Sequence, residues 1–130
     1  MMTLLGFRGL LDTVAEGWNA GDAAMAAACF TEDAVYVEPP DRQRYDGRPH
    51  LAEFFGGCDD MSMRWHLTAF SEEDQAGFGE YTFSLIGRVT KHGIVVVEIE
   101  RQLIASWREY QYDSELSFEE FAGDSVRRSR

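Results

Sequence analysis

The chain has 130 residues, a length that suits one domain able to bury a hydrophobic core. Hydrophobic residues make up 45% of the sequence and aromatic residues 13%, which favours a folded globule over a disordered acidic chain. The formal net charge of −11 argues against nucleic acid and anionic membranes as partners, because both would repel such a surface.

Residues 3–20 are expected to form an amphipathic helix. Its hydrophobic side chains recur at spacings of four, three and four residues, the period of one helical face: Phe7, Leu11, Val14 and Trp18. Gly21 suits the end of this helix, and Asp22 suits the N-cap of a second helix over residues 23–30. The sequence therefore predicts a helical N-terminal quarter.

A strand is expected from Ala34 to Glu38, where the two prolines Pro39 and Pro40 stop it. Side chains alternate along a strand, so Ala34, Tyr36 and Glu38 share one face. A carboxylate at the rim of an apolar core is costly to hold as an ion. This cost makes Glu38 a candidate functional residue.

A short helix opening at Pro49 is expected over residues 49–55, and β-branched and aromatic residues then predict a run of strands. The expected strands span residues 63–70, 77–87, 93–101 and 103–113. Helices followed by antiparallel strands indicate an α+β fold with helices on one face of a curved sheet. We find no repeat or linker, so we expect one domain over residues 1–130.

Several segments together carry a resemblance to a known superfamily. The segments are Asn19–Asp22, Phe30–Ala34, Glu38–Pro39, Tyr45–Phe55 and Leu103–Tyr110. They resemble, in the expected order, the signature of the nuclear transport factor 2-like superfamily, in particular its SnoaL-like polyketide cyclase and ketosteroid isomerase branches. The resemblance implies a cone of three helices against a strongly bent mixed sheet, an apolar pocket between them, and a homodimer paired through the convex face of the sheet.

Strand alternation then predicts which side chains face this pocket. With Glu38 inside, the other inward residues are expected to be Tyr36, Tyr81, Phe83, Trp107 and Glu109, together with Trp18 and Phe55 from the helices. On residues 93–101 the simplest inward set is Ile94, Val96 and Glu98, although a slip of one residue would substitute Ile99. On residues 63–70 either His66 or Trp65 faces inward, and His66 is a candidate substrate contact because imidazole titrates near neutrality.

The resemblance assigns chemistry to some of these positions. Glu38 stands where ketosteroid isomerases have the base that moves a proton between carbons, and Glu98 falls near their protonated second acid. Glu109 is the alternative candidate for this protonated second acid. Val14 is expected among the substrate contacts, but it occupies the position of the family's oxyanion-hole tyrosine, so Tyr36 or Tyr81 would have to supply a hydrogen bond to the substrate.

A related branch, similar to limonene epoxide hydrolase, needs an Arg and an Asp where this sequence has Tyr81 and Phe83, which argues against epoxide hydrolysis. The preferred interpretation is an isomerase, cyclase or dehydratase that acts on an apolar carbonyl compound by carboxylate acid–base catalysis. The alternative is a non-catalytic ligand-binding or dimerisation module.

No metal-ligand spacing and no phosphate-binding loop is recognisable, so neither a metal nor another cofactor is expected. Cys29 and Cys58 make no disulfide framework, and Arg8 and Asp12 interrupt any signal-peptide core at the N-terminus. A reducing, cytoplasmic setting is therefore expected.

Overall fold

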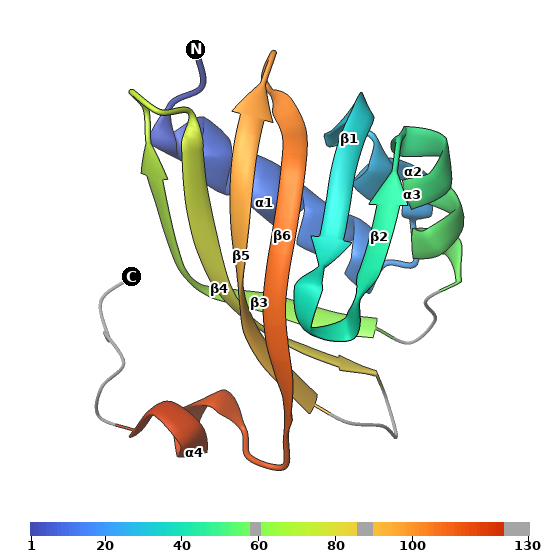
Figure 1. Cartoon of the computed structure of the whole chain (residues 1–130). Helices are drawn as coiled ribbons and strands as arrows, with labels where there is room; N and C mark the ends of the chain where they lie inside the picture. The colour runs from blue at the N-terminus through green and yellow to red at the C-terminus, as the bar shows by residue number, and fades with distance from the viewer. Residues whose placement is uncertain (58–60, 86–89, 124–130) are drawn as a thin grey trace.

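The computed structural model describes residues 1–57, 61–85 and 90–123, which form an α+β structure (Figure 1). The helices are α1 (Leu4–Asn19), α2 (Ala23–Ala27), the 3-10 helix η1 (Pro39–Asp41), α3 (Arg48–Gly56) and α4 (Phe118–Ala122). The strands are β1 (Phe30–Glu38), β2 (Gln43–Asp46), β3 (Met61–Ser71), β4 (Ala76–Leu85), β5 (Thr90–Glu100) and β6 (Leu103–Ser114).

These strands form one mixed sheet in the order β2-β1-β6-β5-β4-β3. The pairing of β1 with β6 is parallel and the other pairings are antiparallel. Helix α1 crosses one face of the sheet, called the inner face below, and α2 and α3 lie beside β1 and β2 (Figure 1). The predicted α+β architecture, with N-terminal helices against a mixed sheet, is confirmed.

Helix α1 follows the predicted span closely, because its capping residues and its apolar face indicate the same start and end. The Thr3 side chain accepts a hydrogen bond from the Gly6 amide, and beyond the helix Gly21 adopts a φ of 69°. The four side chains of the predicted apolar stripe are all buried against the sheet and α2. Burial of this stripe, more than helix propensity, holds α1 in place.

The second helix is shorter than predicted. It ends at Ala27, and Phe30 already belongs to β1, where it pairs with Ile104 of β6. This pairing starts the strand four residues before Ala34. Cys29, between the two elements, is buried and has a free thiol, whereas Cys58 lies outside the described residues.

Two further elements were not predicted. Strand β2 is short and largely exposed, so its sequence lacks a hydrophobic signal. Helix α4 carries a capping box, in which the Ser117 side chain and the Glu120 side chain each bond the other residue's backbone amide. The predicted strand over residues 77–87 ends at Leu85 in the structure, and its last two residues lie outside the described part of the chain.

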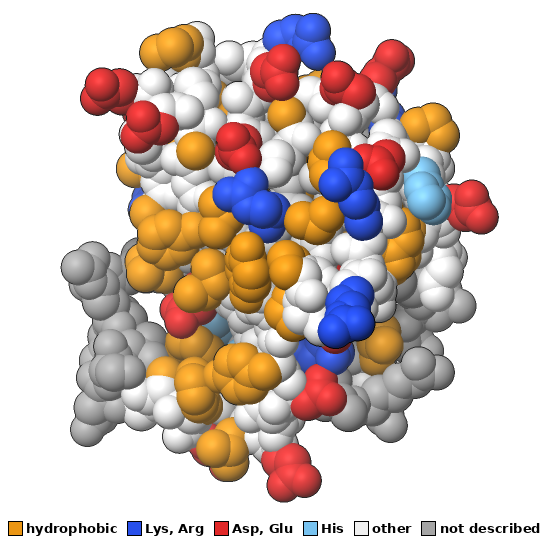
Figure 2. Space-filling model, in the orientation of Figure 1, with side chains coloured by type: hydrophobic (Ala, Val, Ile, Leu, Met, Phe, Trp, Pro, Cys, Tyr) orange, Lys and Arg blue, Asp and Glu red, His pale blue; other side chains and the backbone are white. Residues whose placement is uncertain are grey.

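The outer face of the sheet, opposite α1, carries exposed hydrophobic side chains, which gather on the surface shown in Figure 2. They come from β5, β6, the segment that leads into α4, and α4 itself: Ile94, Tyr110, Tyr112, Leu116 and Phe121. No helix among the described residues is long and apolar enough to cross a membrane.

Candidate functional site

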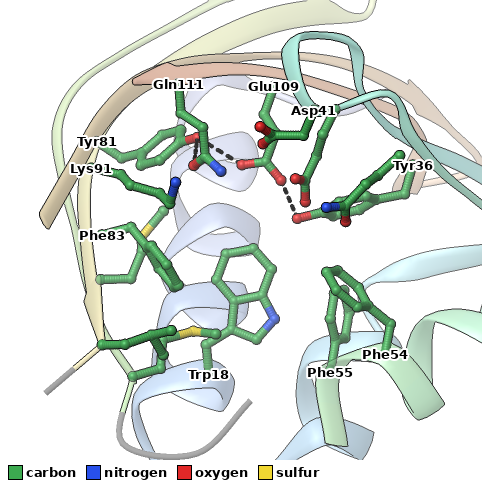
Figure 3. Close-up of a pocket in the computed structure, with 15 residues that line it drawn as sticks. Trp18, Tyr36, Asp41, Phe54, Phe55, Tyr81, Phe83, Lys91, Glu109 and Gln111 are labelled. Atoms are coloured by element: carbon green, nitrogen blue, oxygen red, sulfur yellow. Dashed lines mark hydrogen bonds between the residues drawn. The ribbon is translucent and has the colours of Figure 1, made fainter. Parts of the chain in front are cut away.

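A cavity of about 340 Å³ lies between the inner face of the sheet and helices α1 and α3 (Figure 3). Its volume is at the lower end of the range for ligand pockets, ~300–1,000 Å³. Most of its wall is aromatic, aliphatic or thioether: Trp18, Phe54, Phe55, Met61, Met63, Phe83 and Leu85. An apolar ligand would gain free energy from leaving water for such a wall.

One corner of the cavity is polar and is built from three strands. Both oxygens of the Glu109 carboxyl, on β6, accept hydrogen bonds from phenols: Oε1 from the Tyr36 hydroxyl of β1, and Oε2 from the Tyr81 hydroxyl of β4 at 2.7 Å. The Tyr81 oxygen is also 2.8 Å from Oε1 of Gln111. Glu38, at the end of β1, lines the same cavity as Glu109, and the charge of Glu109 acts on its carboxyl.

The two carboxyl groups are both nearly buried, with residue exposures of 6% for Glu38 and 5% for Glu109. Burial is the largest cause that raises the pKa of Glu38 to about 8, and the negative charge of Glu109 raises it further. Burial also raises the pKa of Glu109, whereas the hydrogen bonds from Tyr36 and Tyr81 oppose that rise. Two carboxylates in contact cannot both ionise at low cost, so the pair retains one proton near neutral pH.

The hydrogen bonds indicate which carboxyl holds this proton. A neutral phenol donates to a carboxylate oxygen, and Glu109 accepts such a bond on each of its oxygens. Burial and the neighbouring carboxylate raise the pKa of Tyr36 well above its ordinary value, and they raise that of Tyr81 as well, so both phenols stay protonated donors. These two donors favour the ionised form of Glu109 over the ionised form of Glu38.

Of the predicted wall residues, Trp18, Phe55, Tyr81 and Phe83 line the cavity. Trp107 lies one layer behind it: its side chain is fully buried and its ring stacks on that of Tyr36 at 5.7 Å and 8°. Val14 is also fully buried in the core and does not line the cavity. The prediction that Val14 contacts a ligand is wrong, because α1 turns this side chain into the helix–sheet core.

The prediction that Glu98 faces the pocket is also wrong. Its side chain lies on the outer face, 52% exposed, in an ion pair with Arg108 at 2.6 Å. The inward residues of β5 are Val95, Val97 and Ile99, the alternative register. Gly93 takes the inward place before them, since a Cβ there would lie 2.8 Å from the Tyr81 hydroxyl oxygen.

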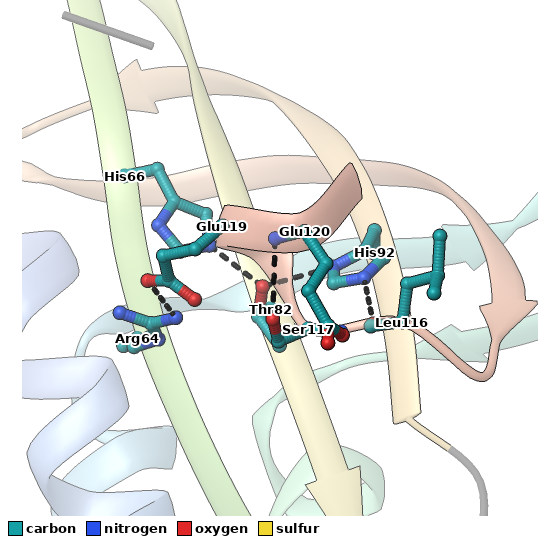
Figure 4. A network of polar contacts seen from close by, with 8 residues as sticks. All are labelled: Arg64, His66, Thr82, His92, Leu116, Ser117, Glu119 and Glu120. Carbon is teal, nitrogen blue, oxygen red and sulfur yellow. Dashed lines mark hydrogen bonds and ion pairs between the residues drawn. The ribbon is translucent and has the colours of Figure 1, made fainter. Parts of the chain in front are cut away.

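His66 likewise lies away from the cavity, and Trp65 faces inward, where its Nε1 donates to the Leu11 carbonyl at 2.9 Å. On the outer face, His66 Nε2 is 2.6 Å from the Thr82 hydroxyl (Figure 4). The His66 ring also stacks on Phe118 of α4. The role predicted for His66 as a substrate contact is therefore wrong.

The same network connects Thr82 to His92, as Figure 4 shows. Thr82 Oγ1 is 2.9 Å from His92 Nδ1, and His92 Nε2 is 2.9 Å from the Leu116 carbonyl. Because a carbonyl only accepts, His92 carries its proton on Nε2 and its Nδ1 accepts from Thr82. The two histidines thus help to hold α4 on the outer face.

Four polar side chains of the cavity wall were not predicted: Asp41, Gln43, Lys91 and Gln111. Gln111 could have been found by alternation, because it lies two residues from the inward Glu109 on β6. Lys91 could not, because alternation leaves the register of β5 open. The places of Asp41 and Gln43 in the cavity wall depend on the turn over Pro39–Asp41. Strand alternation does not predict where the side chains of a turn point. The Lys91 ammonium pairs with Asp113 at 2.6 Å.

Sequence comparison identifies the family. A model described as SnoaL-like domain matches residues 11–107. The chain belongs to the SnoaL-like domain family. The matched span includes the second half of α1, the strand that carries Glu38 and the inward residues of β4 and β5, whereas Glu109 lies just beyond it. No curated protein sequence matches the chain.

Solved structures confirm the cystatin-like, nuclear transport factor 2-like fold. A protein of unknown function with a cystatin-like fold from Methylobium petroleophilum PM1 is 17% identical with a TM-score of 0.76, over 99% of this chain and 97% of that chain. A proposed ketosteroid isomerase from Kribbella flavida DSM 17836 is also 17% identical, with a TM-score of 0.73, over 95% of this chain and 92% of that chain.

A third similar structure contains a small ligand. It is a hypothetical protein with a ketosteroid isomerase-like fold from Catenulispora acidiphila DSM 44928, in complex with trimethylamine. It is 13% identical, with a TM-score of 0.69 over 78% of this chain and 83% of that chain. At these identities the similarity establishes the fold, and the chemistry has to be argued from the residues of this chain.

Proposed function

We propose that this SnoaL-like protein is a cofactor-independent enzyme that moves protons next to the carbonyl group of an apolar small molecule. The observation that carries the proposal is the pair of buried carboxyl groups, Glu38 and Glu109, that line the same aromatic cavity. An ionised and a protonated carboxyl beside one largely apolar cavity would provide a base and an acid together. Isomerisation, cyclisation and dehydration can all use such a pair.

In the proposed reaction Glu109 is the base and Glu38 the acid. Glu109 removes a proton from the carbon next to the carbonyl, while Glu38 donates its proton to the carbonyl oxygen, which gives a neutral enol. The protons then return, one of them to a different atom of the substrate. This reverses the role that the family resemblance gave to Glu38, because the two phenols stabilise the charge on Glu109. Each of the two groups is expected to contribute ~10²–10⁴ in rate.

The aromatic wall would bind the apolar body of the substrate and keep water from the enol. Tyr36 and Tyr81 would orient Glu109. Epoxide hydrolysis is not proposed, because the inward positions of β4 hold Tyr81 and Phe83 instead of an Arg and an Asp.

The test is hydrogen–deuterium exchange of ketones in D₂O, which needs no knowledge of the natural substrate. A panel of 1-indanone, 1-tetralone and 2-methylcyclohexanone is incubated with the protein, and loss of the α-proton signals is followed by ¹H NMR. We expect catalysed exchange that Glu38→Gln and Glu109→Gln each reduce by ~10²–10⁴. Glu98→Gln is the matched control, because its carboxyl lies on the outer face. Equal rates in all four proteins would contradict the proposal.

A non-catalytic binding module is the second candidate, and the saturation of both Glu109 oxygens by phenols favours it. A base whose lone pairs are already engaged is less able to take a proton from carbon. Binding of the ketones, seen as quenching of Trp18 fluorescence, without any catalysed exchange would support the module instead of the enzyme.

We further propose that the chain acts as a single cytoplasmic domain and pairs with a second copy through the outer face. The exposed hydrophobic side chains there support this pairing, among them Ile94, 43% exposed, and Tyr110, 47% exposed. Light scattering after gel filtration should give a dimer mass for the wild type and a monomer mass for Ile94→Asp/Tyr110→Asp. A wild-type monomer at high protein concentration would contradict the pairing.

A further inference from the structure

The buried pair of carboxyl groups needs a route by which it exchanges protons with bulk water. Glu38 and Glu109 are almost inaccessible to solvent, and the phenols on Glu109 are buried as well. A proton taken from a substrate would otherwise return only to that substrate. The segment that follows Glu38 contains a group suited to this exchange.

The sequence Glu38-Pro39-Pro40-Asp41 folds as a tight turn. Pro39–Asp41 form the 3-10 helix η1, and the Arg42 amide closes it by donating to the Pro39 carbonyl at 3.2 Å. Two prolines restrict φ at consecutive positions, so this turn loses little entropy on folding. It brings the side chain three residues after Glu38 back toward the Glu38 carboxyl.

Asp41 therefore lies where buried and solvent-exposed surfaces meet. It is an exposed residue, yet it lines the same cavity as Glu38, and Figure 3 shows its carboxyl pointing into the polar corner with Glu109 and the Tyr36 hydroxyl. Its negative charge raises the pKa of both Glu38 and Tyr81.

We propose that Asp41 is a positioning residue that relays protons between bulk water and the Glu38–Glu109 pair. This inference rests on the proposed function and deepens it, since it determines whether the proton that returns to the substrate comes from solvent. Water delivers a proton to Asp41, Asp41 passes one to Glu38 within the cavity that both residues line, and an equal number of protons leaves by the same route. The ionisable groups that line the cavity around Glu38 are Tyr36, Asp41, Tyr81, Lys91 and Glu109.

The first experiment is chemical rescue of α-proton exchange of 1-indanone in D₂O. Asp41→Ala is expected to lower the maximal exchange rate by about tenfold or more, less than the ~10²–10⁴ loss expected for an acid or base itself, with little change in KM. Added acetate or formate should restore the rate, because a small carboxylate can occupy the vacated space. Asp46→Ala is the matched control, because that carboxylate lies outside the cavity and is paired with Arg44. An unchanged rate in Asp41→Ala, or a loss that carboxylates do not rescue, would overturn the relay.

The second experiment needs no substrate. Because Asp41 raises the pKa of Glu38, Asp41→Ala should lower the pH at which the Glu38 carboxyl titrates by ¹³C NMR, and Asp46→Ala should not. A wild type that does not exchange 1-indanone counts against the proposed function, whereas an unaltered Glu38 titration in Asp41→Ala counts against the relay. The two failures are thereby distinguished.

Discussion

Replacement of Glu38 by glutamine should change how the stability of the protein depends on pH. Burial and Glu109 raise the pKa of Glu38 from its ordinary 4.5 to about 8. In the unfolded chain this carboxyl ionises above pH 4.5, whereas in the folded protein it stays protonated to about pH 8. The contribution of Glu38 to stability is therefore fully present below pH 4.5 and is lost as the pH rises from 4.5 through about 8.

The size of the effect follows from the two pKa values. At ~1.4 kcal/mol per pH unit, the interval from 4.5 to about 8 corresponds to about 5 kcal/mol, an upper limit because solvent on the side of the exposed Asp41 screens part of the charge. A glutamine side chain has no carboxyl to ionise, so the Glu38→Gln variant should lose none of this stability. The free energy of unfolding of Glu38→Gln, relative to that of the wild type, should therefore increase by up to about 5 kcal/mol between acidic and alkaline pH.

The assay is urea denaturation of both proteins at pH 5, 6, 7, 8 and 9, with midpoints compared at a common m-value. Glu98→Gln is the control, and its curve should run parallel to that of the wild type because Glu98 is exposed. Parallel curves for the wild type and Glu38→Gln would refute the reasoning, since they would mean that Glu38 ionises as it does in water.

Three other substitutions test neighbouring parts of the site. Tyr36→Phe removes a donor to ionised Glu109, so urea denaturation at pH 7 should show a loss of about 1.5–3 kcal/mol; no loss would mean that Glu109 is not charged. Gly93→Ala places a Cβ 2.8 Å from the Tyr81 hydroxyl oxygen and 2.7 Å from the Tyr110 carbonyl oxygen, and should reduce ketone exchange; wild-type exchange would show that Tyr81 need not stay in place. In a Cys58→Ser protein, Cys29 should react with a disulfide reagent at pH 8 only after unfolding, because burial raises its thiol pKa to about 11; rapid reaction of the folded protein would contradict this burial.

The sequence alone predicts which side chains face the core where apolar and polar residues alternate clearly. Ala34, Tyr36 and Glu38 share a buried face as predicted, because Val35 and Val37 occupy the less buried side of β1. On β5 the run Val95–Val97 is apolar on both faces, so alternation could not choose the register. The choice is made by Gly93, whose missing side chain makes room for Tyr81, a contact between strands that no single segment reveals.

Other parts of the site depend on distances between segments far apart in the sequence. The phenol of Tyr36 meets Glu109 across 73 positions, and the family resemblance alone did not show that Glu109, and not Glu98, is the partner of Glu38. The position of Asp41 depends on a proline turn, whose end point follows from backbone geometry. These contacts decide the charge of each carboxyl, and therefore its proposed role.

The most direct test of the account is the protonation state of Glu38 and Glu109 in the ligand-free protein. Carboxyl ¹³C resonances can be assigned by comparing the wild type with Glu38→Gln and Glu109→Gln, and then followed through a pH titration. We predict that one carboxyl of the pair, Glu38, remains protonated until about pH 8. Ionisation of both carboxyls near the ordinary glutamate value of ~4.3 would contradict the shared proton, and with it the proposed chemistry.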